Sequence, residues 1–221
     1  ISRGSNRKGI IAACVYFACK ECEVPRTPKE IASMFTIDIT VMTKGIKKCQ
    51  EIVFMNKKIQ ILDKEAVDRK INRLAWEIYE KNSKENEIVI IGISGRGEIL
   101  ATELSKAICD ISSMKIKLGT LKLDKDNPYH NDITVDLITE DYSQKVVILI
   151  DDVLNSGKTL MYASTYFLNT TLIKLSTLVL VDRNHNLFPV KADYVGLSLA
   201  TTLQEYVTVF LEGDSKGVYL S

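Results

Sequence analysis

The pattern of apolar and polar positions divides the chain into a helical beginning and a longer part in which strands and helices alternate. A first helix, with Ile10, Ile11, Cys14 and Val15 at helical spacing, follows a possible cap at Ser5 or Asn6. Thr27-Pro28-Lys29-Glu30 forms a capping box with proline at the first helical position, so a short helix should run through Met34 or Phe35. After a turn over 36–40, a third helix completes an all-helical segment. The residues on one face of this third helix are Met42, Ile46, Cys49 and Val53.

From about residue 55 the pattern changes. Asp63 is placed to cap a long helix whose apolar stripe is Val67, Ile71, Leu74, Ala75, Ile78 and Tyr79, and Trp76 on this helix is most simply a packing residue. Short apolar runs then alternate with helices near 97–110 and 158–169. The predicted strands are 87–93, 115–123, 132–138, 145–150, 174–181 and 193–198. Helices between short apolar strands predict an α/β fold, with a parallel sheet covered on both faces.

The stretch Val146–Leu160 carries the most chemical information. An apolar run ends in Asp151 and Asp152, a small polar loop follows, and Leu160 begins a helical pattern. Backbone N–H groups of a glycine-containing loop at a helix N-terminus form an anion site. Two adjacent acids suit ribose hydroxyls or a hydrated magnesium ion. The stretch therefore predicts a site for a sugar phosphate at the carboxyl end of a central strand.

Two other interpretations apply to this loop. Gly157-Lys158-Thr159 is like the end of a nucleotide-binding P-loop, but that motif needs a glycine where Asp152 stands, and an anion there would face the phosphates. The loop could also be an ordinary strand-to-helix turn whose acids are incidental. The acid pair at the end of a predicted central strand favours the sugar-phosphate interpretation over both.

Residues Ile150–Thr159 resemble the phosphoribosyl-diphosphate (PRPP) loop of type I phosphoribosyltransferases, with Ser156 in place of the usual threonine. Gly92-Ile93-Ser94-Gly95-Arg96-Gly97 resembles the short loop that holds diphosphate in that family. The segments 179–185 and 192–196 resemble the base-binding end of its pyrimidine-operon regulator and uracil phosphoribosyltransferase branch. The similarity covers about residues 55–221. It implies a type I phosphoribosyltransferase fold, a central parallel sheet flanked by helices and preceded by the short helical segment.

The resemblance also implies roles for individual residues. Asp151, Asp152 and Arg96 are the expected catalytic residues, and Asp151 and Asp152 would also face the ribose hydroxyls and the Mg²⁺ shell. Arg96 would meet the diphosphate through a bidentate fork, the alternative being a plain surface arginine. The remaining ligand-binding residues are Ser94 and Gly95 at the diphosphate and Asn155, Ser156, Gly157, Lys158 and Thr159 at the 5-phosphate.

A polar, proline-containing segment, 124–132, separates two predicted strands. Members of the family that it resembles carry a mobile loop here that closes over PRPP and excludes water. The usual arginine is missing, so either Lys125 or His130 substitutes for it or the segment is a plain hairpin connection. His185 lies near the base or is simply solvated.

The expected reaction joins a nucleobase to the ribosyl group of PRPP and releases diphosphate. Uracil is the leading base because Asp182-Arg183-Asn184-His185 and Asp193-Tyr194-Val195-Gly196 resemble the pyrimidine branch, and hypoxanthine or guanine is the nearest rival. A regulator that keeps the fold and binds RNA is another possibility. The excess of three acidic residues in 55–221, and Leu197 where those relatives carry lysine, argue mildly against it. The resemblance also suggests a homodimer.

The two parts of the chain differ in net charge and in their number of cysteines. Residues 1–54 have nine Lys/Arg against five Asp/Glu, a balance of +4, whereas 55–221 have twenty against twenty-three, a balance of −3. Four of the five cysteines fall in 1–54, where reduced core cysteines are favoured over a zinc site at Cys19-x-x-Cys22. We expect a cytoplasmic, reducing location, since no run approaches the roughly 18 to 20 apolar residues of a membrane span and no secretory signal is evident.

Residues 9–19 and 24–32 resemble part of a cyclin-like repeat of transcription initiation factor IIB. Only about three of the family's five helices are present, and its last two contact promoter DNA, so we expect a truncated repeat without tight DNA binding. The lysines of the third predicted helix have two interpretations. They either face DNA as part of a helix-turn-helix or form a solvated surface; these residues are Lys44, Lys47 and Lys48. Met55 reads like a native start, and our hypothesis is a fusion of segment 1–54 to a transferase domain 55–221.

Overall fold

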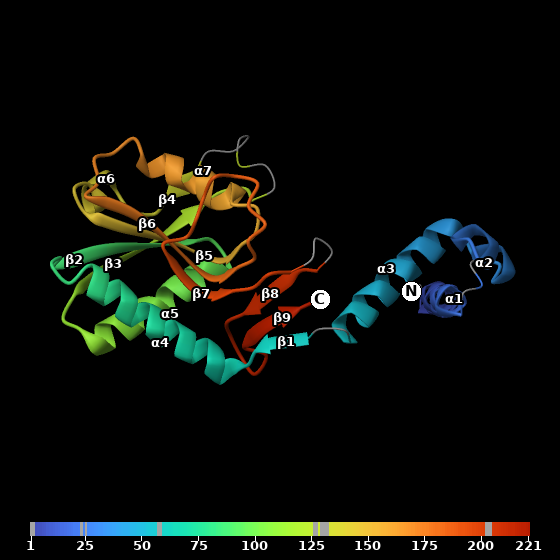
Figure 1. The fold of residues 1–221 in the computed structure, drawn as a ribbon. Helices are drawn as coiled ribbons and strands as arrows, with labels where there is room; N and C mark the ends of the chain where they lie inside the picture. Colours follow the sequence, from blue (N-terminus) through green and yellow to red (C-terminus); the bar gives the residue numbers. More distant parts are fainter. Residues whose placement is uncertain are drawn as a thin grey trace. The chain divides into compact units, whose positions relative to one another are not determined.

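The computed structural model describes residues 3–22, 24, 26–56, 59–125, 128, 133–201 and 205–221. These divide into two compact units, residues 1–59 together with Ser221, and residues 60–220. Each unit is described by itself (Figure 1).

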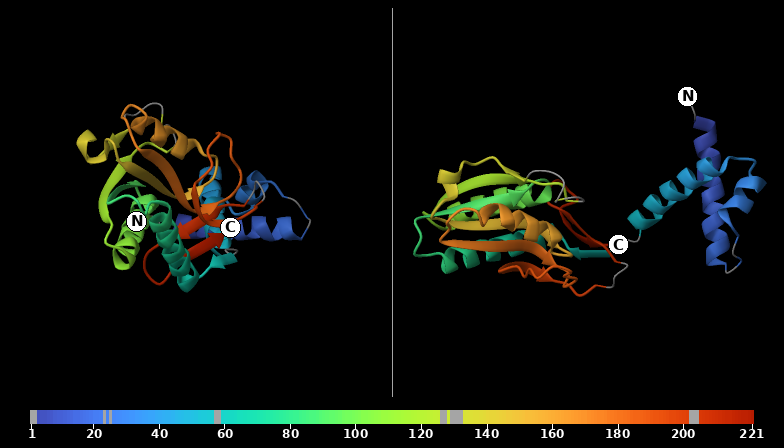
Figure 2. Two further views of the ribbon diagram at one scale, coloured as in Figure 1. Left: turned by 60° about the vertical axis from the view of Figure 1, so that its left-hand side comes forward. Right: turned by 90° about the horizontal axis from the view of Figure 1, so that it is seen from above.

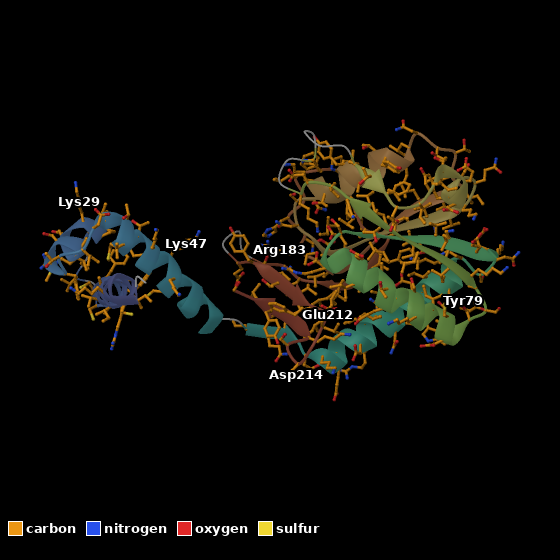
Figure 3. All side chains as sticks on the ribbon, turned by 180° about the vertical axis from the view of Figure 1, so that it is seen from behind. Lys29, Lys47, Tyr79, Arg183, Glu212 and Asp214 are labelled. Carbon is orange, nitrogen blue, oxygen red and sulfur yellow. The ribbon has the colours of Figure 1, made fainter. Side chains whose placement is uncertain are left out.

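The first unit contains three helices, α1 (Arg3–Glu21), α2 (Pro28–Met34) and α3 (Ile39–Asn56). Both hydrogen bonds of the predicted capping box are present, because Thr27 accepts from the Glu30 backbone and the Glu30 side chain accepts from the Thr27 backbone. Ala12, Ile31, Ala32 and Met42 form a small buried core. The third helix begins at Ile39, inside the predicted turn, and Lys47 extends from its exposed surface (Figure 3).

A six-stranded sheet in the order β4-β3-β2-β5-β6-β7 is the centre of the second unit. Its strands are β2 (Glu87–Ile93), β3 (Lys115–Lys122), β4 (Thr134–Val135), β5 (Val146–Leu154), β6 (Lys174–Asp182) and β7 (Tyr194–Ser198). Neighbouring strands are parallel except at the β4 edge, where β4 runs antiparallel to β3. The predicted parallel sheet is thus confirmed for five strands. The strand expected over 132–138 is reduced to two residues, and Asp132 lies outside the described residues.

Alternate residues of the central strands face two separate hydrophobic layers. Ile88, Ile90, Ile148 and Ile150 pack with α4 (Lys64–Lys81) and α5 (Arg96–Ile111). Their neighbours along the same strands point to the other face, where they pack with α7 (Lys158–Phe167) and with Tyr142 of α6 (Thr139–Tyr142). These neighbours are Val89, Ile91, Val147 and Leu149. The four helices therefore cover both faces of the sheet, α4 and α5 on one and α6 and α7 on the other (Figures 1 and 2).

The long helix after Asp63 is confirmed as α4. The Asp63 carboxylate accepts a hydrogen bond of 2.8 Å from the Ala66 backbone, and the predicted stripe from Val67 to Ile78 is buried. Trp76 is not a core residue, however. It is 48% exposed and makes an edge contact with Tyr79.

A second, three-stranded sheet was not expected from the sequence. It consists of β1 (Ile59–Leu62), β9 (Gly217–Leu220) and β8 (Val207–Phe210), in that order. The strands are only four residues long, and Gln60 of β1 donates to the hydroxyl of Tyr219 in β9, 159 positions away, a pairing that local periodicity does not reveal.

The buried Lys216 fastens this small sheet to the helices of the second unit. Its ammonium lies 2.8 Å from the carboxylate of Asp68 in α4 and 2.8 Å from that of Glu103 in α5. Among the described residues, no helix combines the length and apolar character needed to cross a membrane.

Candidate functional site

The candidate site lies where the direction of winding of the large sheet reverses. From β2 the chain crosses to β3 on one side, whereas β5 is followed by β6 on the other. Gly92 of β2 pairs with Ile150 of β5, so the residues that follow both strands emerge side by side at one sheet edge. Open α/β sheets bind ligands at such switch points.

Asp151 and Asp152 are buried at the carboxyl end of β5, with exposures of 4% and 7%. The strand continues to Leu154, four residues beyond its predicted end, so the acid pair belongs to the strand itself. The Asp151 carboxylate also accepts a hydrogen bond of 3.1 Å from the Asp152 backbone N–H. The two carboxylates thus interact with each other at a site largely shielded from solvent.

Each of these acids faces a cation from another part of the chain, Arg96 at the start of α5 and Lys125 in the segment after β3. The Arg96 guanidinium lies 3.2 Å from the Asp152 carboxylate, and the Lys125 ammonium lies 3.1 Å from that of Asp151. Burial raises the pKa of Asp151 to about 7, while the Lys125 charge opposes that rise and the Asp152 charge adds to it. Asp151 is therefore poised to change its ionisation near neutral pH.

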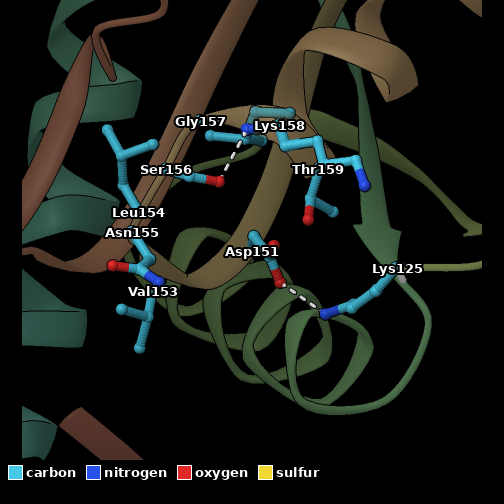
Figure 4. Close-up of a pocket in the computed structure, with 10 residues that line it drawn as sticks. Lys125, Asp151, Val153, Leu154, Asn155, Ser156, Gly157, Lys158 and Thr159 are labelled. Carbon is cyan, nitrogen blue, oxygen red and sulfur yellow. Dashed lines mark hydrogen bonds and ion pairs between the residues drawn. The ribbon is translucent and has the colours of Figure 1, made fainter. Parts of the chain in front are cut away.

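A cavity of about 210 Å³ opens beside Asp151, between Lys125 and the loop that precedes α7. Figure 4 shows the Lys125 side chain reaching the Asp151 carboxylate and the Ser156 hydroxyl directed at the Lys158 backbone N–H. The lining includes the whole predicted phosphate loop. Its residues are Lys125, Asp151, Val153, Leu154, Asn155, Ser156, Gly157, Lys158, Thr159 and Leu160.

The cavity lies at the N-terminus of α7, where backbone N–H groups lack partners within the helix. Gly157, the residue before the helix, has φ +81, a left-handed conformation that glycine adopts without strain. Of the loop residues that line the cavity, Lys158 is cationic and Asn155, Ser156, Gly157 and Thr159 are uncharged. This arrangement suits a phosphate group.

Ser94, Gly95 and Arg96 follow β2 and do not line this cavity; Arg96 reaches the acid pair through Asp152. The start of α5 packs closely on β5 at Gly97, where a Cβ atom would lie 2.7 Å from the Ile150 carbonyl oxygen. That close approach places Arg96 beside Asp152. The structure thus brings the two predicted loops together through the acid pair.

The residues expected near the base have mainly structural contacts. Asp193 accepts a hydrogen bond of 2.8 Å from the Thr177 backbone, and the buried Tyr194 hydroxyl accepts one of 3.1 Å from Asn82. His185 Nε2 lies 2.7 Å from the Thr201 carbonyl oxygen, so its ring has a partner within the protein. His130 lies outside the described residues.

The sequence left the role of Lys125 open between alternatives and gave Arg183 no role of its own. Lys125, one of two suggested substitutes for a missing arginine, lies at the cavity, although only its position in a polar segment pointed to it. Arg183 appeared only within a resembling segment, yet its buried side chain contacts Asn155 of the phosphate loop. An arginine directly after an apolar strand was the one local signal for it.

Comparisons with known families agree with the geometry. Residues 59–210 match the phosphoribosyl transferase domain, and residues 1–52 match the transcription factor TFIIB repeat. The first of these matches confirms the resemblance in the transferase part, and the second confirms the one in the helical segment.

Among curated proteins, the chain is 36% identical to the bifunctional protein PyrR of Clostridium acetobutylicum over 179 residues, which is 75% of this chain and 99% of that protein. It is 38% identical to the bifunctional protein PyrR of Staphylococcus aureus over 160 residues, 69% of this chain and 91% of the relative.

Solved structures share the fold at lower identity. A crystal structure of the Trypanosoma cruzi hypoxanthine phosphoribosyltransferase aligns with a TM-score of 0.62 at 17% identity, covering 73% of this chain and 94% of that one. A hypoxanthine-guanine phosphoribosyltransferase of Bacillus anthracis aligns with a TM-score of 0.54 at 22% identity, covering 63% and 81%. The domain match and the long alignments to the relatives lead to one conclusion: this chain belongs to the phosphoribosyltransferase family.

Proposed function

We propose that the chain transfers the 5-phosphoribosyl group of PRPP to a nucleobase, with uracil as the leading acceptor. The bond from ribose C1 to the diphosphate oxygen breaks, its electron pair leaves with diphosphate, and a base nitrogen bonds to C1 and loses its proton. One observation carries the proposal: the buried Asp151 borders a cavity at the N-terminus of α7, and the buried carboxylate of its neighbour Asp152 interacts with that of Asp151.

Each part of the site has a role in this proposal. Residues 155–159 hold the 5-phosphate, and Ser94, Gly95 and Arg96 hold the diphosphate. Asp151 and Asp152 accept hydrogen bonds from the ribose hydroxyls, which fixes C1 between the leaving diphosphate and the incoming base. Lys125, at the edge of the cavity, adds positive charge near the ligand.

The ion pairs that Asp151 and Asp152 make with Lys125 and Arg96 are compatible with PRPP binding. PRPP brings its own anionic groups, so Arg96 and Lys125 can exchange a carboxylate partner for a phosphate oxygen when it binds. The carboxylates are then free for the hydroxyls of the sugar. Ion pairs that persisted unchanged beside bound PRPP would contradict the assignment of Asp151 and Asp152.

Magnesium fits the donor set at this site. Mg²⁺ is commonly bound by one or two carboxylates together with water and substrate phosphate oxygens; Asp151 supplies one carboxylate at the cavity, and Asp152 supplies a second beside it. When bound there, the ion neutralises negative charge on the diphosphate. Among the described residues, no cluster of three or more metal-ligating side chains forms a separate cage, so the substrate would have to contribute ligands.

The test uses the purified full chain with PRPP, Mg²⁺ and a panel of uracil, hypoxanthine and guanine, while diphosphate release is followed. We expect diphosphate release that depends on uracil, and product analysis should identify the matching nucleoside monophosphate. Turnover with hypoxanthine or guanine in its place would keep the reaction and correct the acceptor. No release with any base, from protein that is folded, would contradict the proposal.

A regulator that binds RNA is the second candidate, favoured by the resemblance of residues 179–185 to the pyrimidine-operon branch. The −3 balance of 55–221 and the uncharged Leu197 argue against a basic RNA surface there. A salt titration of RNA binding tests the regulator. Contacts to RNA phosphates would make the affinity for RNA fall steeply as the salt concentration rises.

For residues 1–54 we propose no DNA-binding role. A gel-shift assay in which the full chain bound duplex DNA tightly and in a salt-sensitive way, and lost that binding when Lys44, Lys47 and Lys48 were replaced by alanine, would overturn this view.

A further inference from the structure

Arg183 is a buried cation at the same edge of the sheet as the acid pair. It directly follows β6, is 4% exposed, and donates a backbone hydrogen bond of 3.0 Å to Leu154 of β5. The next residue, Asn184, has φ 55, and its backbone N–H bonds to the Asp182 carboxylate at 2.8 Å. This turn fixes where the Arg183 side chain leaves the main chain.

The guanidinium of Arg183 bonds to two segments at once. Towards the phosphate loop, Nη1 donates to the Asn155 side-chain oxygen at 3.0 Å. Towards the chain that follows β7, Nε donates to the Thr201 hydroxyl at 3.1 Å and Nη2 donates to the Glu205 carbonyl oxygen. Its charge also lies 5.9 Å from the centre of the Tyr206 ring.

Further contacts tie the same two segments to residues 183–188. His185 Nε2 lies 2.7 Å from the Thr201 carbonyl oxygen. The backbone N–H groups of Leu187 and Phe188 donate to the Ser156 carbonyl oxygen at 2.9 and 3.0 Å. Residues 183–188 therefore lie between the phosphate loop and Thr201, and Arg183 contacts both.

The order of the strands indicates what lies on each side of the ribose. In the proposed function, the residues assigned to the diphosphate follow β2, and the acids assigned to the ribose lie near the carboxyl end of β5. Displacement at C1 brings the base in from the side opposite the leaving group, which here is the β6 and β7 side. Thr201 follows β7, so it lies on the side from which the base approaches.

We infer that Arg183 is a positioning residue that couples the phosphate loop to the base side of the site, so that the phosphate and the base of one ligand bind cooperatively. This inference rests on the proposed function. An arginine suits the role because its planar fork directs several donors at fixed angles, whereas a lysine ammonium cannot reach Asn155 and Thr201 with the same geometry.

The test compares two probes in calorimetric titrations of the full chain. Ribose 5-phosphate occupies the phosphate loop alone, whereas UMP also extends to the base side, and IMP serves as a second nucleotide. The ratio of the Kd of ribose 5-phosphate to that of the tighter nucleotide measures the coupling. Arg183→Lys breaks the fork, and Thr201→Val removes its base-side acceptor while leaving Arg183 in place.

We expect both variants to lower this ratio at least about fivefold, the small end of ordinary coupling between sites. In Thr201→Val, the Kd of ribose 5-phosphate and the KM for PRPP should stay within about twofold of wild type, while the KM for the base rises by a similar factor of about five. Arg69→Lys is the matched control, since Arg69 is an exposed helix residue paired with Glu65, and it should change nothing.

The coupling would be refuted if the ratio of the two Kd values were unchanged in both variants. It would also be refuted if ribose 5-phosphate and the nucleotide lost affinity by the same factor. Thr201→Val guards against misfolding of Arg183→Lys, because it removes one hydroxyl and leaves the buried charge in place. A wild-type chain that binds neither ribose 5-phosphate nor PRPP with Mg²⁺ would instead refute the proposed function, and the coupling with it.

Discussion

The ammonium of Lys125 lies 3.1 Å from the carboxylate of Asp151, although the two residues are 26 positions apart. Lys125 comes from the polar segment after β3, and Asp151 lies near the carboxyl end of β5, with β2 between the two strands in the sheet. The contact joins the exposed rim of the cavity to its buried wall, since the Lys125 side chain is 41% exposed and that of Asp151 is 5% exposed. The ionisation of Asp151 should therefore be linked to the binding of an anionic ligand by Lys125.

Asp152→Asn should abolish turnover while leaving the fold intact. The substitution keeps the shape of the side chain but removes the charge that Arg96 contacts and that the ribose hydroxyls and Mg²⁺ would use. We expect kcat/KM to fall by at least about a hundredfold, with little change in thermal unfolding. Asp214→Asn, at an exposed turn, is the matched control. Wild-type activity in Asp152→Asn would refute the site assignment.

Binding of PRPP with Mg²⁺ should weaken as the pH falls below neutrality. Burial raises the pKa of Asp151 to about 7, and its ionised form accepts stronger hydrogen bonds from ribose hydroxyls and attracts a cation, which the protonated form does not. The Kd should rise roughly tenfold for each pH unit below that value, as measured by calorimetry between pH 5.5 and 8. A flat profile would mean that Asp151 does not contact the ligand.

The same group should make folding stability depend on pH in the opposite direction. Because its pKa is raised from 3.8 in the ordinary state to about 7 in the fold, Asp151 binds its proton more tightly in the folded chain. Its stabilising contribution is full below about pH 4 and is lost as the pH rises through about 7. Urea unfolding should therefore show Asp151→Asn gaining stability relative to wild type over that interval; a constant difference would contradict the raised pKa.

Lys125→Met should move the pH dependence of PRPP binding to higher pH. The Lys125 charge lowers the pKa of Asp151, so its removal lets burial raise that pKa further. Lys125→Arg restores a cation and should return the profile towards that of wild type. If Lys125→Met binds PRPP with an unshifted profile, the ion pair does not persist in solution.

Gly97→Ala should destabilise the second unit and lower its activity. The added Cβ would lie 2.7 Å from the Ile150 carbonyl oxygen and 3.2 Å from the Asp151 Cα, so the start of α5 must move away from β5. Overpacking of this kind costs about 1–3 kcal/mol, which thermal unfolding measures. Activity should fall as well, because Arg96 moves with the helix; an unchanged melting temperature would show that the helix adapts freely.

The local sequence determined much of this protein. Alternation between apolar runs and helical stripes predicted the parallel sheet, its covering helices, and the helical segment before them. The capping signals at Thr27 and Asp63 were sufficient to locate two helix starts, because caps depend on hydrogen bonds between residues three positions apart. The acid pair and the phosphate loop are also contiguous in sequence, which is why the PRPP-like loop could be read directly.

Tertiary structure decided what depends on contacts between distant residues. The small sheet joins β1 to the end of the chain, and its four-residue strands have no distinctive period. The pairing of Lys125 with Asp151, and of Arg183 with both Asn155 and Thr201, arises because parallel strands place their carboxyl ends at one edge. The sequence was sufficient to identify the two acids and the loop at residues 155–159. Only the packing of the strands determined which cations face the acids and how far burial raises the pKa of Asp151.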